Sequence, residues 1–242
     1  MLYQKRNRTM KKILVYLLVP MLVFSLWSCD KSTEGLTRIT YYPTLEVLGE
    51  LTVVVNVGEA YSDEGCYAEL NGEDVSSEVI VTSNVDYSTP GVYSISYVIY
   101  NADGFSTTAS RTVYVVDPVN IATIYLGESM TSTSHYYDAL IFITDNGDGT
   151  YHLDDLMGGF QFNGLNPGFE PTYDFHAEVD FQINADNSIS LTGNVGSWYF
   201  GDTGDVVLGL TSGSYDPATR TFTLNVDYGG TPMTVILRAM TK

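Results

Sequence analysis

Few side chains in this sequence could act as a nucleophile, a general acid or a general base. The sequence has no Gly-x-Ser-x-Gly elbow, no His-Glu-x-x-His motif and no phosphate-binding glycine loop. Its three histidines are isolated, each in or beside a strand-like stretch, and are expected to be packed or surface residues: His135, His152 and His176. Cys66 lies far along the chain from all of them, so we expect a small buried apolar role for its side chain.

Two adjacent carboxylates, Asp154 and Asp155, lie in the strand-like stretch 149–156. Successive side chains of a strand point to opposite faces, so these two cannot act as a paired acid and base. Carboxylates that folding brings together could still form a glycosidase pair, but no pattern in the sequence indicates one. We therefore expect a protein that is not an enzyme and that carries no cofactor.

Acidic residues in turns are the potential metal ligands. Five of them could meet at one end of a β-sandwich and hold calcium through oxygen atoms: Asp63, Glu64, Glu73, Asp74 and Asp103. The stretch "DNGDG" at 145–149 lacks EF-hand spacing, because a glycine occupies its third position and no glutamate closes the loop. Solvated turns and a hairpin explain these residues better, so no metal site is predicted.

Aromatic rings that could stack on a sugar lie in two segments that depart from the strand pattern. Segment 158–176, "GGFQFNGLNPGFEPTYDFH", is long, irregular and rich in aromatic residues, and "GSWYFGD" at 196–202 holds the tryptophan that remains after residue 28. Long irregular loops within compact domains are often functional. The candidate ligand-binding residues are Trp198, Tyr199, Phe169 and Tyr173. The same rings could instead form a small core beneath a loop, and both interpretations stay open.

The N-terminal segment has the pattern of a targeting signal. Five basic residues precede the apolar run 13–27, which Pro20 interrupts and which is shorter than the roughly 20 residues that span a bilayer. The end of this run, Leu26-Trp27-Ser28-Cys29, resembles the bacterial lipobox, in which the cysteine is acylated and becomes the first mature residue. We therefore expect a lipoprotein signal peptide at 1–28 and a lipidated tether at 29–35, with Cys29 as the site of the membrane anchor.

The charge balance excludes nucleic acid as a partner. The full chain has a formal net charge of −18, and removal of residues 1–28 leaves six basic and 29 acidic residues, a net charge of −23. Such an acidic chain repels phosphate backbones. The acidic residues are scattered along the sequence, which is typical of a solvated surface.

Beyond residue 35 the apolar residues recur with period two, which predicts strands. Runs at 51–58, 79–85, 91–101 and 110–117 are separated by turn residues, including "NADG" at 101–104. Inward-facing positions are expected at Val53, Val55, Val92, Ile95, Tyr97 and Val113. Pro118 marks a boundary, after which further strand patterns continue to residue 240. The sequence predicts an all-β chain with a β-sandwich at 36–117 and a second antiparallel β-sandwich or open barrel at 118–242.

Residues 36–117 resemble a bacterial immunoglobulin-like (Ig-like) domain of the type named after a pesticidal crystal protein. The matching positions are Val57-Gly58-Glu59, Asp63, Gly65, Val85-Asp86, Pro90-Gly91-Val92-Tyr93, Tyr97 and Asp103-Gly104. Cys66 stands where the pattern more often has an aliphatic residue. The resemblance implies an Ig-like fold that acts as a spacer or presentation module.

The second half is similar, more loosely, to the β-rich C-terminal domain of Bacteroidetes surface lipoproteins. The similarity is in "GDGTYHLDDLMGGF" (147–160), "ADNSISL" (185–191) and "SGSYDPATRTF" (212–222). It implies an outer-membrane, surface-exposed lipoprotein, and members of that family often accompany polysaccharide-uptake systems. The favoured hypothesis is a non-catalytic binding accessory with glycan as its ligand; the alternative is a structural or protein-interaction module, and a hydrolase ranks last.

Overall fold

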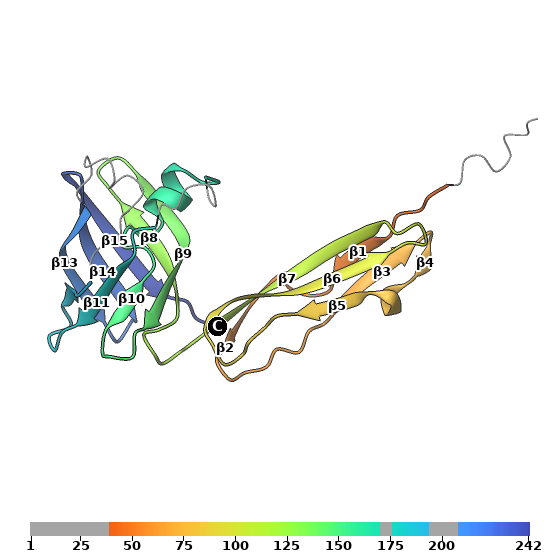
Figure 1. Cartoon of the computed structure of the whole chain (residues 1–242), viewed down its shortest axis with the longest axis horizontal. Coiled ribbons are helices and arrows are strands. Elements are labelled where there is room, and N and C mark those ends of the chain that lie inside the picture. Colours follow the sequence, from red (N-terminus) through yellow and green to blue (C-terminus); the bar gives the residue numbers. More distant parts are fainter. Residues whose placement is uncertain (1–38, 170–175, 194–207) are drawn as a thin grey trace, which may run out of the picture. The chain divides into compact units, whose positions relative to one another are not determined.

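The computed structural model describes residues 39–169, 176–193 and 208–242 (Figure 1). Residues 44–116 form two sheets. One has the strand order β1-β3-β4 and is made of Thr44–Val47, Cys66–Leu70 and Glu73–Asp74, followed by a short 3₁₀ helix, η1, at Ser76–Glu78. The other has the order β2-β7-β6-β5, made of β2 (Thr52–Asn56), β5 (Ile80–Ser83), β6 (Gly91–Tyr100) and β7 (Ser106–Val116). Strands β2 and β7 pair in parallel, and the other pairs are antiparallel.

Alternating apolar side chains of these sheets form the core of this half. Ile95, Tyr97 and Val113 are buried as predicted. Val92 is 41% exposed, so its predicted inward position is wrong: it differs from Ile95 by an odd number of residues and therefore points to the other face of β6. Cys66 is half-buried against this core, and burial raises the pKa of its thiol.

A charged side chain also lies inside this half. The Arg111 guanidinium is fully buried, and its Nε is 2.9 Å from Asp63 Oδ1. Arg111 donates further hydrogen bonds to the carbonyl oxygens of Leu48 and Glu50. The hydroxyl of Tyr97 donates to the same carboxylate at 2.7 Å, and burial raises the pKa of Tyr97 to about 12. Asp63 thus neutralises a buried cation, whereas the sequence predicted that it lies in a solvated turn.

The C-terminal half is an eight-stranded antiparallel sheet. Its order is β12-β11-β10-β9-β8-β15-β14-β13. The strands are β8 (Ile124–Met130), β9 (His135–Asp145), β10 (Tyr151–Leu153), β11 (Val179–Ile183), β12 (Ile189–Leu191), β13 (Leu208–Asp216), β14 (Thr221–Tyr228) and β15 (Thr231–Ala239). A bridge between Ser188 and Ser214 joins the two end strands, so the sheet curls into a nearly closed barrel (Figure 1).

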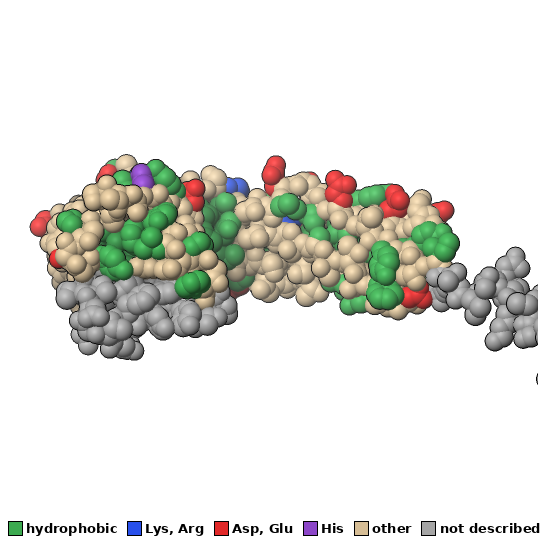
Figure 2. Space-filling model, turned by 90° about the horizontal axis from the view of Figure 1, so that it is seen from above, with side chains coloured by type: hydrophobic (Ala, Val, Ile, Leu, Met, Phe, Trp, Pro, Cys, Tyr) green, Lys and Arg blue, Asp and Glu red, His purple; other side chains and the backbone are tan. Residues whose placement is uncertain are grey.

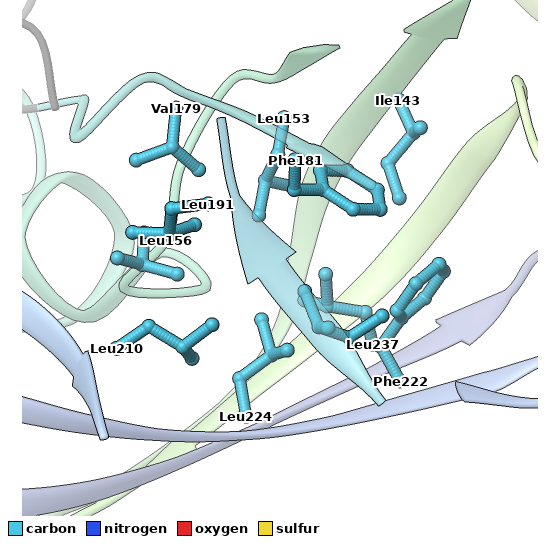
Figure 3. A pocket seen from close by; sticks show the side chains of 11 residues that line it. Ile143, Leu153, Leu156, Val179, Phe181, Leu191, Leu210, Phe222, Leu224 and Leu237 are labelled. Atoms are coloured by element: carbon cyan, nitrogen blue, oxygen red, sulfur yellow. The ribbon is translucent and has the colours of Figure 1, made fainter. Parts of the chain in front are cut away.

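The interior of this barrel is packed with apolar side chains. Figure 3 shows leucine, isoleucine, valine and phenylalanine side chains pointing towards one another from several strands, with Leu156 joining them from the segment after β10. The cavity left between them has a volume of about 10 Å³, the space of a single water molecule, and its lining is entirely apolar. Among the described residues, a cavity of this size is too small for a ligand larger than a water molecule.

The segment after β10 closes one end of the barrel. It contains a single π-helical turn, η2, at Phe160–Leu165. Phe160 is buried, with its ring centroid 5.5 Å from that of Tyr136 and 5.9 Å from that of Tyr228. For Phe160 and Phe162, which also packs against the core, the structure supports the interpretation of a mini-core beneath a loop.

The all-β class is confirmed, with a two-sheet sandwich followed by an antiparallel, nearly closed barrel. The domain boundaries at 36–117 and 118–242 stay a prediction about independent folding. Within the described part of the chain, no helix is long and apolar enough to cross a membrane.

Candidate functional site

The structure describes one of the residues predicted to bind a ligand or a lipid. Phe169 follows the turn after η2 and is 50% exposed. Tyr173, Trp198, Tyr199 and Cys29, together with the signal peptide and tether at 1–35, lie outside the described residues.

Asp154 and Asp155 were predicted to lie in a strand, and this prediction is wrong, because β10 ends at Leu153. Asp155 is fully buried and accepts backbone N–H bonds from Met157, Gly159 and Ala177 at 2.6–3.1 Å. Burial raises the pKa of this carboxyl, and the three N–H donors act in the opposite direction. Asp155 therefore fixes the turn at the start of the segment after β10, which closes one end of the barrel. This is a structural role.

Asp154 makes stability depend on pH. Burial raises the pKa of its carboxyl from 3.8 to about 7, and its Oδ1 accepts the N–H of Phe142 at 2.9 Å. Between these values the folded state holds a proton that the unfolded state has released, so this contribution is complete below about pH 4 and is lost as the pH rises through 7. We expect Asp154→Asn to match the wild type at pH 4 and to be more stable by about 2–4 kcal/mol at pH 8. Thermal unfolding of both proteins at pH 4 and pH 8 tests this. A difference in stability between the two proteins that does not change with pH would contradict it.

The three histidines lie in three separate environments. His152 Nδ1 is 2.9 Å from Asp180 Oδ1, and this hydrogen bond lowers the pKa of the Asp180 carboxyl. The ring centroid of His176 is 4.3 Å from that of Phe162. Among the described residues, no group of three or more His, Cys, Asp and Glu side chains has the arrangement of a metal site.

His135 belongs to a hydrogen-bonded cluster on the outer face of the barrel. Its Nε2 is 2.7 Å from Glu128 Oε1, and its Nδ1 is 2.6 Å from the hydroxyl of Tyr137. Glu128 also pairs with Arg238 at 2.5 Å, and the hydrogen bonds from Arg238 and His135 lower the pKa of the Glu128 carboxyl. Tyr137 is 54% exposed. This cluster holds an aromatic ring in a fixed position at the surface.

A hollow of about 460 Å³ lies across strands β13, β14, β15 and β8, and we call it the outer groove. It is lined by residues 130–132, 211, 225–227 and 232–234. Its size lies within the range of small-molecule sites in proteins. Half of the described lining residues carry hydroxyls or an amide: Thr131, Ser132, Thr211, Thr234 and Asn225. Asp227 adds a carboxylate and Met130 and Pro232 add apolar atoms, whereas the side chains of Val226 and Met233 are buried in the barrel core.

Hydrogen bonds fix the polar side chains of the outer groove before any ligand arrives. The Asn225 amide donates to Ser212 Oγ at 2.9 Å, and its Oδ1 accepts from Thr234 Oγ1 at 3.2 Å. Thr211 Oγ1 donates to the Asn225 carbonyl oxygen at 2.9 Å. An amide and a hydroxyl each have more donor and acceptor positions than these bonds use. These side chains form a row of hydroxyl and amide groups, which can therefore form further hydrogen bonds to a ligand that has many hydroxyl groups.

The His135 cluster lies next to the outer groove. Met130, which lines the groove, is the cross-strand partner of His135, and an irregularity in the β8–β9 pairing between Gly127 and Ser129 accompanies the positive φ of Asp138. This surface could not be predicted from the sequence, because polar residues at every second position of a strand have the same pattern whether they bind a ligand or only water.

On the face shown in Figure 2, acidic side chains are spread over the surface and do not gather into one patch. This agrees with their scatter along the sequence. The acidity of the chain therefore does not by itself mark a binding site.

The comparisons with known proteins give the family. A family model described as "Bacterial surface protein, Ig-like domain" matches residues 45–115, and a model of a C-terminal domain matches residues 117–239. Among solved structures, the lipoprotein BT2262 from Bacteroides thetaiotaomicron is 30% identical, with a TM-score of 0.52, over 82% of this chain and 100% of that chain. No curated protein matches.

Two solved structures of Clostridium perfringens ZmpB match weakly. One contains the M60 catalytic domain with CBM51-1 and CBM51-2, at 9% identity and a TM-score of 0.28 over 84% of this chain and 22% of that chain. The other contains CBM51-2 in complex with GlcNAc and INT domains, at 11% identity and a TM-score of 0.26 over 83% and 44%. Scores this low carry no argument about ligand. The 30% identity to BT2262, over 82% of this chain and 100% of that chain, shows the family. The chain belongs to the family of the Bacteroides lipoprotein BT2262, with an Ig-like domain of bacterial surface proteins followed by a C-terminal domain.

Proposed function

We propose that this protein is a lipid-anchored, surface-exposed protein of the outer membrane that binds glycan without catalysing a reaction, as an accessory in polysaccharide utilisation. The observation that supports glycan best is the outer groove, with its fixed row of hydroxyl and amide groups. Sugars present many hydroxyl groups and apolar C–H faces, and the groove offers hydrogen-bonding groups beside methionine and proline atoms. The lipoprotein relative supports an envelope location.

A glycan array tests this proposal. The chain from residue 30 onward, labelled and applied to arrayed plant, fungal and host glycans, should retain a defined subset and release it unmodified. Trp198→Ala should weaken this retention if the predicted residues Trp198, Tyr199, Phe169 and Tyr173 contribute to the site. Retention of no glycan would overturn the proposed function, and cleavage of a retained glycan would show an enzyme.

The lipid anchor has its own test. Replacing Cys29 by alanine should abolish acylation, because the lipobox cysteine is the residue that carries the acyl chains. The protein should then move from the membrane fraction to the soluble fraction, and the mass of the mature N-terminus should lose the lipid. Cys66→Ala is the matched control, since it removes the other cysteine and should leave the protein in the membrane fraction. Unchanged fractionation of the Cys29 variant would contradict the anchor.

A protein-interaction role is the second candidate. Strand β5 is an edge of the Ig-like sheet, and Ile80 and Val81 on it are 55% and 53% exposed. Exposed edge strands with apolar side chains can accept a strand from another protein. This role is favoured if the array retains no glycan and if Val81→Lys removes a crosslinked neighbour on intact cells.

A further inference from the structure

We infer that the outer groove and the Tyr137–His135 ring pair form one continuous binding surface for an uncharged, linear saccharide. This rests on the proposed function and adds to it the place, the length and the charge of the ligand. One end of this surface lies in the groove, at Asn225 on β14 and Thr234 on β15. The other end is the pair of rings on β9.

The continuity follows from the register of the sheet. Asn225 pairs with Thr234, Thr234 pairs with Met130, and Met130 pairs with His135. These four residues form a row across β14, β15, β8 and β9 on the outer face of the barrel. Neighbouring strands are about 4.8 Å apart, so the row is roughly 14 Å long. A chain of about three pyranose rings, each roughly one strand spacing in length, would span it.

Tyr137 is suited to stack on the last of these rings. Its hydroxyl is hydrogen-bonded to His135 Nδ1 at 2.6 Å, and the centroids of the two rings are 4.0 Å apart. The backbone is held as well, because the Asn163 amide of η2 donates to the Tyr137 carbonyl oxygen at 3.0 Å. A ring that is 54% exposed and already fixed loses little conformational entropy when a sugar packs against it.

The charges around this surface select against acidic sugars. None of the described residues that line the groove is basic, and Asp227 adds a carboxylate at its edge. Beside the rings, the guanidinium of Arg238 is paired with Glu128 at 2.5 Å. A uronic acid or a sulfated sugar would meet these carboxylates, and the Arg238 guanidinium is already paired with Glu128, so we expect the site to take neutral saccharides.

The test measures binding by the full chain in a sugar-free detergent. The probes are neutral linear hexasaccharides (maltohexaose, cellohexaose, xylohexaose and mannohexaose), with hexagalacturonate as the acidic counterpart and the matching disaccharides as short ligands. We expect at least one neutral hexasaccharide to bind, its disaccharide to bind at least about tenfold more weakly, and hexagalacturonate not to bind.

Three variants locate the site. Tyr137→Ala and Asn225→Ala should each weaken binding about tenfold or more, whereas Tyr137→Phe, which keeps the ring, should stay within about threefold of the wild type. Tyr67→Ala is the matched control, since it truncates an exposed tyrosine of the Ig-like half. Melting temperatures establish that each variant is folded, and Thr234→Val, which removes only a hydroxyl, replaces Asn225→Ala if that variant unfolds.

The outcomes separate the two claims. Binding of a neutral hexasaccharide that survives both alanine variants unchanged would overturn the inference and leave glycan binding intact at another place on the chain. Equal affinity for hexagalacturonate would overturn the charge selection. If none of these probes binds while the array retains other glycans, the inference fails alone; if the array also retains nothing, the proposed function fails with it.

Discussion

Replacing Asp63 by alanine is expected to destabilise the Ig-like half by about 3–5 kcal/mol, because it leaves a fully buried guanidinium without its counterion. Arg111 lies 2.9 Å from this carboxylate, and the hydroxyl of Tyr97 loses the same acceptor. Hydrogen–deuterium exchange of the amides in β6 and β7 measures the effect within the full chain, since loss of stability there shortens their protection.

Asp86→Ala is the matched control for this variant. Asp86 accepts hydrogen bonds from the backbone and side chain of Ser88 in an exposed turn of the same half. The change in charge is the same, but no buried cation is left behind, so we expect a loss of about 1 kcal/mol or less. Similar losses for the two variants would show that the buried ion pair does not stabilise this half.

The second large effect is expected at Phe222, in the centre of the barrel. Its side chain is 1% exposed, and its ring centroid lies 4.6 Å from that of Tyr215, 5.5 Å from that of Tyr125 and 5.6 Å from that of Phe181. Phe222→Ala should cost about 3–5 kcal/mol, because it leaves a cavity among rings that cannot collapse into it. Denaturant unfolding followed by circular dichroism measures the loss.

Phe169→Ala provides the comparison in the same half. Half of this side chain is exposed to solvent, so its removal should cost about 1 kcal/mol or less. If Phe222→Ala were as mild as Phe169→Ala, the packing described for the barrel would be wrong.

The period-two pattern predicted most of the fold because burial on one face of a strand leaves a direct mark on the sequence. Ile95, Tyr97 and Val113 are buried as expected, and the hairpin at 101–104 forms, with the Asn101 side chain accepting the N–H groups of Asp103 and Phe105. Val92 was predicted wrongly because its parity differs from that of Ile95.

Contacts between distant residues could not be predicted in this way. Arg111 has the same parity as Val113, which indicates an inward side chain, but nothing local identifies Asp63 as its partner 48 residues earlier. The same holds for Asp155, whose three N–H donors come from the turn that follows it and from Ala177, 22 residues later. Such pairs depend on how the chain folds back on itself.

The candidate site could also be predicted only in part from the sequence. The aromatic content of 158–176 drew attention to a segment whose buried part, Phe160, proves to plug the barrel, while Phe169 remains at the surface. The outer groove arises from the register of four strands that are distant in sequence, joining Asn225 to Thr234 and Met130. Its residues are ordinary threonines, asparagines and methionines, so composition and spacing could not single them out.

The most direct test of glycan binding on the outer face of the barrel is hydrogen–deuterium exchange of the full chain with and without a saturating neutral hexasaccharide. The structure predicts that the ligand slows exchange in peptides covering 130–137 and 225–234, and leaves the Ig-like peptides at 44–116 unchanged. Protection confined to the Ig-like half, or no protection anywhere at saturation, would contradict the assignment of a glycan site to this face.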